Sequence, residues 1–287
     1  MSTCGLALVP AAQDYLDALW KNAEPSIIKF EFGMQYGDQQ KYVRAFFPPE
    51  LETLELLMLT DVQWGHVECN ERRFIEYRDW VLAKDNRFVF FGGDMVDAAT
   101  VLSIASPYEN KYQPREQLLR FCEIIMPLRH RVIGYVGGNH ERRGTKTFGT
   151  LGSVIAMLLK IPHSDGKQII DIHFGQHSPF KVDLFHGRGA SITKGAKAQM
   201  LHRFMQTGDS QLYLCGHLHD VIVLFDWRQR RVPLRNEVVL QKIAGAMSSS
   251  FLSFWGTYAE VAGLPATDVM MARTILEPNG HWELTLR

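Results

Sequence analysis

Residues 54–63, with the sequence LELLMLTDVQ, carry the pattern that determines the fold. An apolar run suited to a buried strand ends directly at the acid Asp61 and the amide Gln63. The same arrangement returns at residues 87–97, RFVFFGGDMVD, where two glycines and Asp94 follow the apolar run. Short strands that end in polar residues predict a sheet with functional side chains at its strand ends.

The chain around these two stretches alternates between strand-like and helix-like segments. Further buried strands are expected at residues 132–136, 180–185 and 211–214, and helices at residues 71–84, 115–126 and 194–205. In the first of these helices, Phe74, Tyr77, Trp80 and Val81 recur at helical spacing. The alternation predicts an α/β protein in which helices pack on a sheet.

The pattern changes after His219 to strand-like runs at residues 221–227 and 238–244, and then to a final strand pair joined at Asn279-Gly280, a hairpin turn signal. We therefore expect a second sheet. The composition also changes near residue 50, so residues 51–287 are interpreted as one catalytic domain. Residues 1–50 form an N-terminal extension to which the sequence assigns no role.

The composition excludes several classes of protein. The 31 Lys and Arg residues balance the 31 Asp and Glu residues, so no overall basic field attracts duplex DNA or anionic membranes. No segment is long and apolar enough to span a membrane. Four scattered cysteines fit reduced thiols in a cytoplasmic protein better than a disulfide framework. The sequence gives no indication of the oligomeric state.

Five short motifs follow the predicted strands and share the residue types that bind metals. They are Asp61-Val62-Gln63, Gly93-Asp94-Met95-Val96-Asp97, Gly138-Asn139-His140-Glu141, His186-Gly187 and Gly216-His217-Leu218-His219. Carboxylate, amide oxygen and imidazole suit Mn, Fe or Zn, and the glycines allow sharp turns after each strand. Each motif alone is common, but their order and context are specific.

This series resembles the signature of the calcineurin-like metallophosphoesterase superfamily, over roughly residues 54 to 220. The resemblance implies a four-layer α/β/β/α sandwich of two mixed sheets flanked by helices. It also implies a phosphoesterase with two divalent metal ions, Mn first, with Fe, Mg and Zn as alternatives. The stretch from Gly138 to Lys146 also looks like metallophosphoesterases of phage and prophage genomes, which favours nucleic acid or nucleotides as substrates.

The resemblance also implies a role for individual residues. The first metal would be held by Asp61, position 63, Asp94 and His219, and the second by Asp94, Asn139, His186 and His217, so that Asp94 bridges the two ions. His140 would act on the substrate, either as a hydrogen-bond donor to a phosphoryl oxygen or as the acid that protonates the leaving oxygen. A metal-activated water would attack phosphorus.

The first motif departs from the family pattern because Gln63 stands where the family has histidine. An amide oxygen is a harder and less basic donor than imidazole, which favours Mn or Mg over zinc at the first site. We favour Gln63 over His66 as the ligand, and a water in place of either side chain is the remaining alternative.

Basic residues beside the motifs are candidates for substrate binding. Arg142, Lys146 and Arg188 could contact a phosphate, although the first two could equally form a solvated surface. Asp97 is interpreted either as a support for a ligand or as a helix cap. Residues 248–258, SSSFLSFWGTY, either pack in the core or form a lid that stacks on a base.

These features lead to three hypotheses on function. The first is a two-metal phosphodiesterase that acts on DNA ends, single strands or a nucleotide. The second is a phosphomonoesterase or pyrophosphatase that acts on a small metabolite. The third, supported only by Gln63, is a catalytically degenerate phosphoesterase fold that serves as a binding scaffold.

Overall fold

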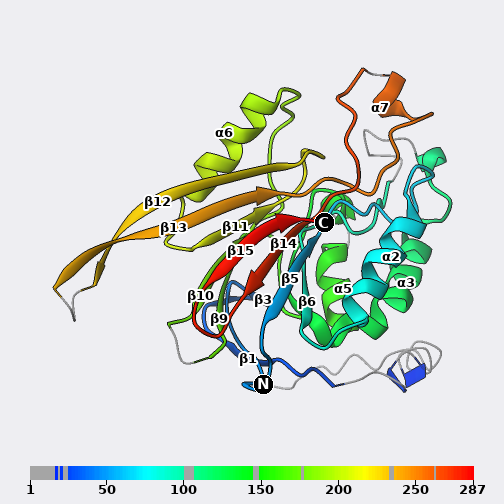
Figure 1. Ribbon diagram of the computed structural model, residues 1–287. Helices are drawn as coiled ribbons and strands as arrows, with labels where there is room; N and C mark the ends of the chain where they lie inside the picture. The colour runs from blue at the N-terminus through cyan, green and yellow to red at the C-terminus, as the bar shows by residue number, and fades with distance from the viewer. Residues whose placement is uncertain are drawn as a thin grey trace.

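The computed structural model describes residues 17, 18, 20, 21, 25–99, 107–144, 149–175, 178–232, 236–261 and 263–287. In this part of the chain, two large mixed sheets and several helices form an α/β structure (Figure 1). The α/β class expected from the alternation of strands and helices is confirmed.

One sheet contains the strands that directly precede the first three motifs in the sequence. Its strand order is β15-β14-β5-β6-β7-β8, with bounds β15 Trp282–Leu286, β14 Ala272–Leu276, β5 Leu54–Leu59, β6 Arg87–Phe91, β7 Val132–Val136 and β8 His163–Ser164. Strands β5 to β8 are parallel, and β14 pairs antiparallel with both β5 and β15. The hairpin expected at Asn279-Gly280 joins β14 to β15.

The other sheet contains the strands that directly precede the last two motifs in the sequence. Its order is β1-β4-β9-β10-β11-β13-β12, with bounds β1 Lys29–Phe32, β4 Tyr42–Phe46, β9 Gln168–His173, β10 Phe180–Leu184, β11 Leu212–Cys215, β13 Glu237–Met247 and β12 Ile222–Val232. A small ribbon is made by β2 Gln35–Tyr36 and β3 Gln39–Gln40. Strands β12 and β13 are longer than expected and project from the body as a ribbon (Figure 1).

Helices cover the outer faces of both sheets. They are α2 Glu71–Leu82, α3 Pro114–Ile125, α5 Leu151–Leu159 and α6 Lys194–Met205. The short α7 Tyr258–Val261 lies away from the sheets, and 3-10 turns occur at η1 Pro107–Glu109, η2 Met126–Arg131 and η3 Glu141–Gly144. Figure 1 shows α2, α3 and α5 on one side of the molecule and α6 on the other. No helix among the described residues combines the length and apolar character needed to cross a membrane.

Three apolar clusters correspond to this arrangement of helices and sheets. Alternate residues of a strand point to opposite faces, so on β5 the side chains of Leu54, Leu56 and Met58 meet the inner face of the larger sheet. The side chains of Leu57 and Leu59 instead pack under α2, α3 and α5. A third cluster lies between α6 and strands β11 to β13. The strand ends are therefore held between two packed sheets.

Part of the N-terminal extension is built into the larger sheet. Strand β4 pairs parallel with β9, and β1 pairs antiparallel with β4 at the sheet edge. No strand was predicted here, because β1 and β4 are only four and five residues long. The division of the chain at residue 50 stays a prediction, but residues 29–46 contribute strands to the same sheet as the later motifs.

Candidate metal centre

Every candidate ligand lies in a loop directly after a strand. Asp61 and Gln63 follow β5, Asp94 follows β6 and Asn139 follows β7, while the histidines His186, His217 and His219 follow β10 and β11. These strands run parallel within each sheet, so their carboxyl ends, where ligands of α/β proteins usually bind, lie at one edge. The fold therefore brings residues from widely separated motifs to one place.

Many of these residues adopt an unusual backbone conformation. The φ angle is positive at Asp61 (50°), Gln63 (49°), Asp94 (52°), His217 (71°) and His219 (47°). Residues other than glycine rarely occupy this left-handed region, which costs about 1–3 kcal/mol per residue and is concentrated at functional sites. The rest of the fold must therefore hold these loops in place.

Two glycines allow the loops to approach closely enough for the ligands to meet. A Cβ atom added at Gly138 would lie 2.0 Å from Asp94 Oδ1, and one added at Gly216 would lie 2.3 Å from Asp61 Oδ2. Any side chain at these two positions would displace a candidate ligand.

Asp94, His186 and His217 form a group that could hold a metal ion. Among the His, Cys, Asp and Glu side chains of the described residues, this is the group of three or more whose candidate ligand atoms all lie within 4.8 Å of one another. His186 Nε2 lies 3.2 Å from both Asp94 Oδ2 and His217 Nδ1. The amide oxygen of Asn139 lies 3.1 Å from the same nitrogen. The four predicted ligands of the second site thus converge.

Outer hydrogen bonds orient the two imidazoles toward the centre of this group. His186 Nδ1 lies 2.8 Å from the carbonyl oxygen of Gly92, and His217 Nε2 lies 2.8 Å from that of Gly189. A carbonyl only accepts hydrogen bonds, so these nitrogens carry the protons and leave His186 Nε2 and His217 Nδ1 as donors of an electron pair. Metal-binding histidines are typically held in this way.

The predicted ligands of the first site form a looser group. Asp61 Oδ2 accepts hydrogen bonds from Thr60 Oγ1 at 2.6 Å and from the His217 backbone at 2.8 Å. Its other oxygen, Oδ1, is buried and lies 3.2 Å from His219 Nε2 without the geometry of a hydrogen bond, and no other described residue donates to it. An unsatisfied buried carboxylate oxygen is costly, and a cation would satisfy it.

The two candidates for the altered position lie in different surroundings. The side-chain amide of Gln63 lies 3.4 Å from His219 Nε2, and either its nitrogen or its oxygen can face the site because the amide can be turned over. The His66 ring instead accepts a hydrogen bond from the Glu68 backbone and lies 3.9 Å from Glu109. Gln63 is thus beside a predicted ligand, whereas the contacts of His66 are with other residues.

The charge of this group attracts cations. Burial disfavours the charged form of Asp94, yet His186 and His140 outweigh it and hold the pKa of Asp94 well below its usual range. Burial likewise disfavours protonated His186, but Asp94 and Asp61 raise the pKa of His186 to about 10. The carboxylates thus stabilise positive charge at this point, and a divalent ion bound there would take the place of a proton. The donor set therefore fits a divalent metal ion.

His140 lies beside this group and is held by two neighbours. Its Nδ1 lies 2.9 Å from Asp97 Oδ1, and its Nε2 lies 3.0 Å from Arg143 Nη2. Burial opposes its charged form, but the nearby carboxylates of Asp94 and Asp97 raise the pKa of His140. Asp97 was expected either to support a ligand or to cap a helix; it orients His140 instead.

Glu141 connects two of the loops that carry candidate ligands, a contact that the sequence did not reveal. It is fully buried, and its Oε2 accepts hydrogen bonds from the backbone of Asp94 at 2.9 Å and of Gly138 at 2.8 Å. Its Oε1 accepts from Met95 N at 2.5 Å and Tyr135 Oη at 3.2 Å. One carboxylate therefore fastens the loops after β6 and β7 together. Only its place beside His140 hinted at this role.

The basic residues expected to bind substrate differ in their surroundings. The guanidinium of Arg142 donates to the carbonyl oxygens of Asp165 and Gly137, while that of its neighbour Arg143 contacts His140. Arg188 is exposed, two residues after His186. Lys146 lies outside the described residues. The sequence singled out Arg142, but Arg143 is the arginine in contact with His140.

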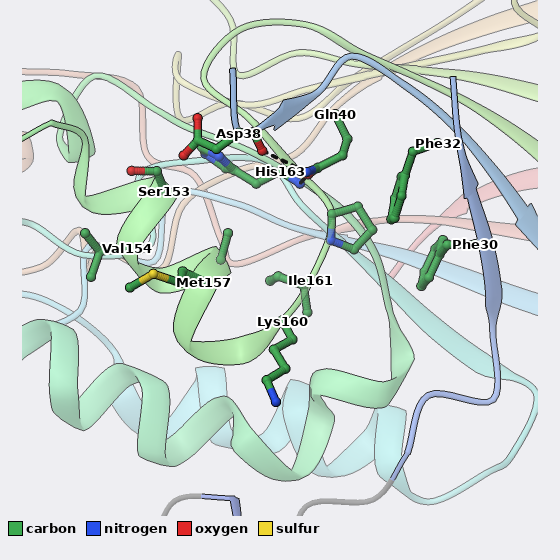
Figure 2. A pocket seen from close by; sticks show the side chains of 12 residues that line it. Phe30, Phe32, Asp38, Gln40, Ser153, Val154, Met157, Lys160, Ile161 and His163 are labelled. Atoms are coloured by element: carbon green, nitrogen blue, oxygen red, sulfur yellow. Dashed lines mark hydrogen bonds between the residues drawn. The ribbon is translucent and has the colours of Figure 1, made fainter. Parts of the chain in front are cut away.

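A separate cavity lies between β1, β3, α5 and β8 (Figure 2). It measures about 440 Å³, and none of the candidate metal ligands lines it. Two of its lining residues are joined by a hydrogen bond, in which the backbone N–H of His163 donates to Gln40 Oε1 at 2.9 Å. This cavity is not part of the candidate metal centre.

Comparisons with known proteins give only distant likenesses. No protein family model and no curated protein matches the chain. A conserved uncharacterized protein from Streptococcus pneumoniae, described as a predicted phosphoesterase, is 15% identical with a TM-score of 0.36, over 83% of this chain and 99% of that one. The NAD nucleotidase of Haemophilus influenzae is 10% identical with a TM-score of 0.36, over 81% of this chain and 49% of the nucleotidase. The function must therefore be argued from the site itself.

Proposed function

We propose that the chain is a metal-dependent phosphoesterase with a four-layer α/β/β/α fold and two divalent ions, and that it hydrolyses phosphodiester bonds. The observation that carries this proposal is the convergence of Asp94, Asn139, His186 and His217, with hydrogen-bonded outer ring nitrogens that leave the inner ones as ligands. Asp61, Gln63 and His219 would hold the other ion. The order of the motifs and their family resemblance also support the proposal.

When bound, divalent ions at such a centre act as Lewis acids on a phosphoryl oxygen and lower the pKa of a water molecule toward neutrality. The chain itself would position the substrate and move a proton. Asp97 holds His140 by its Nδ1, so that Nε2 is the ring atom left to donate a hydrogen bond to the substrate. Arg143, now 3.0 Å from that atom, would bind a phosphoryl oxygen once substrate separates the two side chains.

Nucleotides or nucleic acid remain the proposed substrates, as the partial resemblance to phage enzymes suggests. Manganese is the proposed metal, because the amide of Gln63 takes the place of an imidazole. With zinc alone we expect lower activity than with Mn. Full activity with zinc would contradict this role of Gln63.

The test is hydrolysis by the full chain with added Mn, compared between bis(p-nitrophenyl) phosphate, p-nitrophenyl phosphate and labelled single-stranded DNA. We expect diester cleavage, and we expect Asp94→Asn to reduce kcat by roughly 100-fold or more, since even residues that only orient ligands contribute about 10- to 100-fold. Asp79→Asn, which changes an exposed carboxylate on α2, is the control.

Three results would contradict parts of the proposal. A clear preference for the monoester would favour the phosphomonoesterase. Unchanged activity in Asp94→Asn would remove the metal centre from the reaction. Absence of both hydrolysis and stoichiometric metal, measured by elemental analysis, would favour a binding scaffold.

A further inference from the structure

A cavity of about 360 Å³ opens directly beside the candidate metal centre. His217, Leu218 and His219 form part of its wall, and the remainder comes from Glu68, from residues 189–192, from Lys197 of α6 and from residues between positions 250 and 267. The volume is at the low end of small-molecule sites, which span about 300–1,000 Å³. The organic group of a phosphate ester bound at the centre would therefore lie next to this cavity.

Most of the surface of the cavity is apolar. Leu218, Leu252 and Phe254 line it, together with the more exposed Ile192 and Leu264. Ile192 and Leu264 come from separate loops, and they are 63% and 36% exposed. Apolar surface left in water disfavours the empty state by about 25 cal/mol per Å², so an apolar occupant would stabilise this arrangement.

The cavity offers little positive charge to a second phosphate. Among the described residues that line it, Lys197 is the single lysine or arginine. Its ammonium group is 3.0 Å from Asp220 Oδ2, and both residues are buried. The polar residues that remain include Glu68, which adds an acid rather than a cation, and Ser250, Ser253 and Thr267, whose hydroxyls can bind an uncharged polar group.

Both walls of the cavity are attached to candidate ligands. On one side, the carbonyl of Gly189 accepts the hydrogen bond of His217 Nε2. On the other side, Phe251 N donates to the Asp61 carbonyl at 3.0 Å, and Ser253 N donates to that of Glu68 at 2.9 Å. The cavity is thus fixed relative to the metal centre by the same loops that hold the ligands.

Two aromatic residues of the segment 248–258 lie in different surroundings. Phe251 is fully buried and packs edge-to-face on Phe74 and Tyr77, as a core residue does. Phe254, three residues later, lines the cavity. The segment therefore anchors itself in the core and presents one aromatic side chain to the space beside the centre.

We infer that this cavity binds the uncharged, largely apolar organic group of a small phosphate ester. The inference rests on the proposed function and narrows its substrate. A polynucleotide strand carries a negative charge at each linkage and needs a cationic groove, which the lining of this cavity does not supply. A single aromatic or aliphatic group, of about the size of one ring system, suits it better.

The test uses the Mn-loaded full chain and two phosphonates that differ only in their organic group, phenylphosphonate and methylphosphonate, with binding measured by calorimetry. We expect phenylphosphonate to bind at least about tenfold more tightly, since a single methylene in an apolar pocket is worth about 10- to 200-fold. Phe254→Ala and Ile192→Ser should reduce this ratio to near unity. Ile192 is exposed, so its change should not impair folding.

Trp227→Ala is the control, because it removes an exposed aromatic side chain that lies outside this cavity and should leave the ratio unchanged. Equal affinity for the two phosphonates, no binding of either, or a ratio that survives both cavity variants would each overturn the inference. Because binding is measured without turnover, a phenyl preference in a protein that hydrolyses nothing would contradict the proposed function alone. Hydrolysis without that preference would contradict the inference alone.

Discussion

At the scale of single residues, His163 is a buried histidine in surroundings that favour its neutral form. It is 2% exposed on β8 and packs against the ring of Tyr135. Burial outweighs the attraction of Asp165, whose Oδ1 is 3.4 Å away, and lowers the pKa of His163 to about 4. The folded protein therefore keeps this ring neutral at a pH where an unfolded chain would protonate it.

This difference predicts an acid-sensitive contribution to stability. Because the folded pKa is below the unfolded value near 6.5, the contribution is complete above pH 6.5 and is lost as the pH falls toward 4. At about 1.4 kcal/mol per pH unit, roughly 2 kcal/mol is lost between pH 6.5 and 5. Urea unfolding measures this loss. Between pH 7.5 and pH 5 the free energy of unfolding should decrease less for His163→Leu than for the wild type.

His281→Leu provides the comparison for this experiment, since His281 is 57% exposed beside Glu283. The free energy of unfolding of this variant should depend on pH in the same way as that of the wild type. If the free energy of unfolding decreased equally in the wild type and in His163→Leu, His163 would contribute nothing to acid sensitivity.

The order of the motifs after predicted strands, and the family that this order resembles, were enough to propose Asp94, Asn139, His186 and His217 as ligands. The roles of Glu141 and Arg143 were not predictable in the same way. Both act through atoms brought together by the fold, namely the backbone N–H groups of two loops and the ring of His140. Sequence spacing contains no information on such contacts.

At the scale of elements, long apolar or clearly periodic segments were predicted well. The strands Leu54–Leu59, Arg87–Phe91 and Val132–Val136 and the helix Lys194–Met205 have the expected bounds. The unpredicted elements have weak patterns. Helix α5 is apolar on most of its surface, and β4 and β9 pair with each other across more than a hundred residues. Pairing over such distances is decided by tertiary contacts rather than by local pattern.

The connection between the loops after β6 and β7 leads to a prediction for Glu141→Gln. An amide has one accepting oxygen, whereas the carboxylate accepts from Asp94, Met95, Gly138 and Tyr135, so the substitution would bring N–H groups against each other. We expect a loss of about 1–3 kcal/mol in the free energy of unfolding, typical of an unsatisfied buried group. Calorimetric titration should also show weaker binding of Mn.

Glu116→Gln is the matched control, because Glu116 forms an exposed pair with Arg120 on α3. Exposed pairs of this kind contribute little to stability. If Glu141→Gln were as stable as the control and bound Mn normally, the loops would be held by other contacts.

At the scale of the whole molecule, the candidate ligands come from both sheets. Asp61, Asp94 and Asn139 follow strands of one sheet, and the three histidines follow strands of the other. The ligands can therefore meet only when the two sheets are packed together. A metal ion that binds the folded chain but not the unfolded one shifts the folding equilibrium.

Thermal unfolding should consequently depend on metal concentration. Mn at 100 times its dissociation constant should add about 2.7 kcal/mol to the free energy of unfolding and raise Tm, and a chelator should reverse the change. Scanning calorimetry of the wild type and of Asp94→Asn would measure the effect. An identical Tm increase in the variant would mean that Mn binds elsewhere.

The close approach at Gly138 and Gly216 has a consequence for finding other proteins with this centre. Aspartates and histidines after strands are common, and a chain could keep all of them and still be unable to assemble them. A single methyl group at either glycine would occupy the space of an Asp94 or Asp61 oxygen. When sequences are screened for the same chemistry, these two positions act as a steric filter, and alanine at either of them should disqualify a candidate however complete its ligands are.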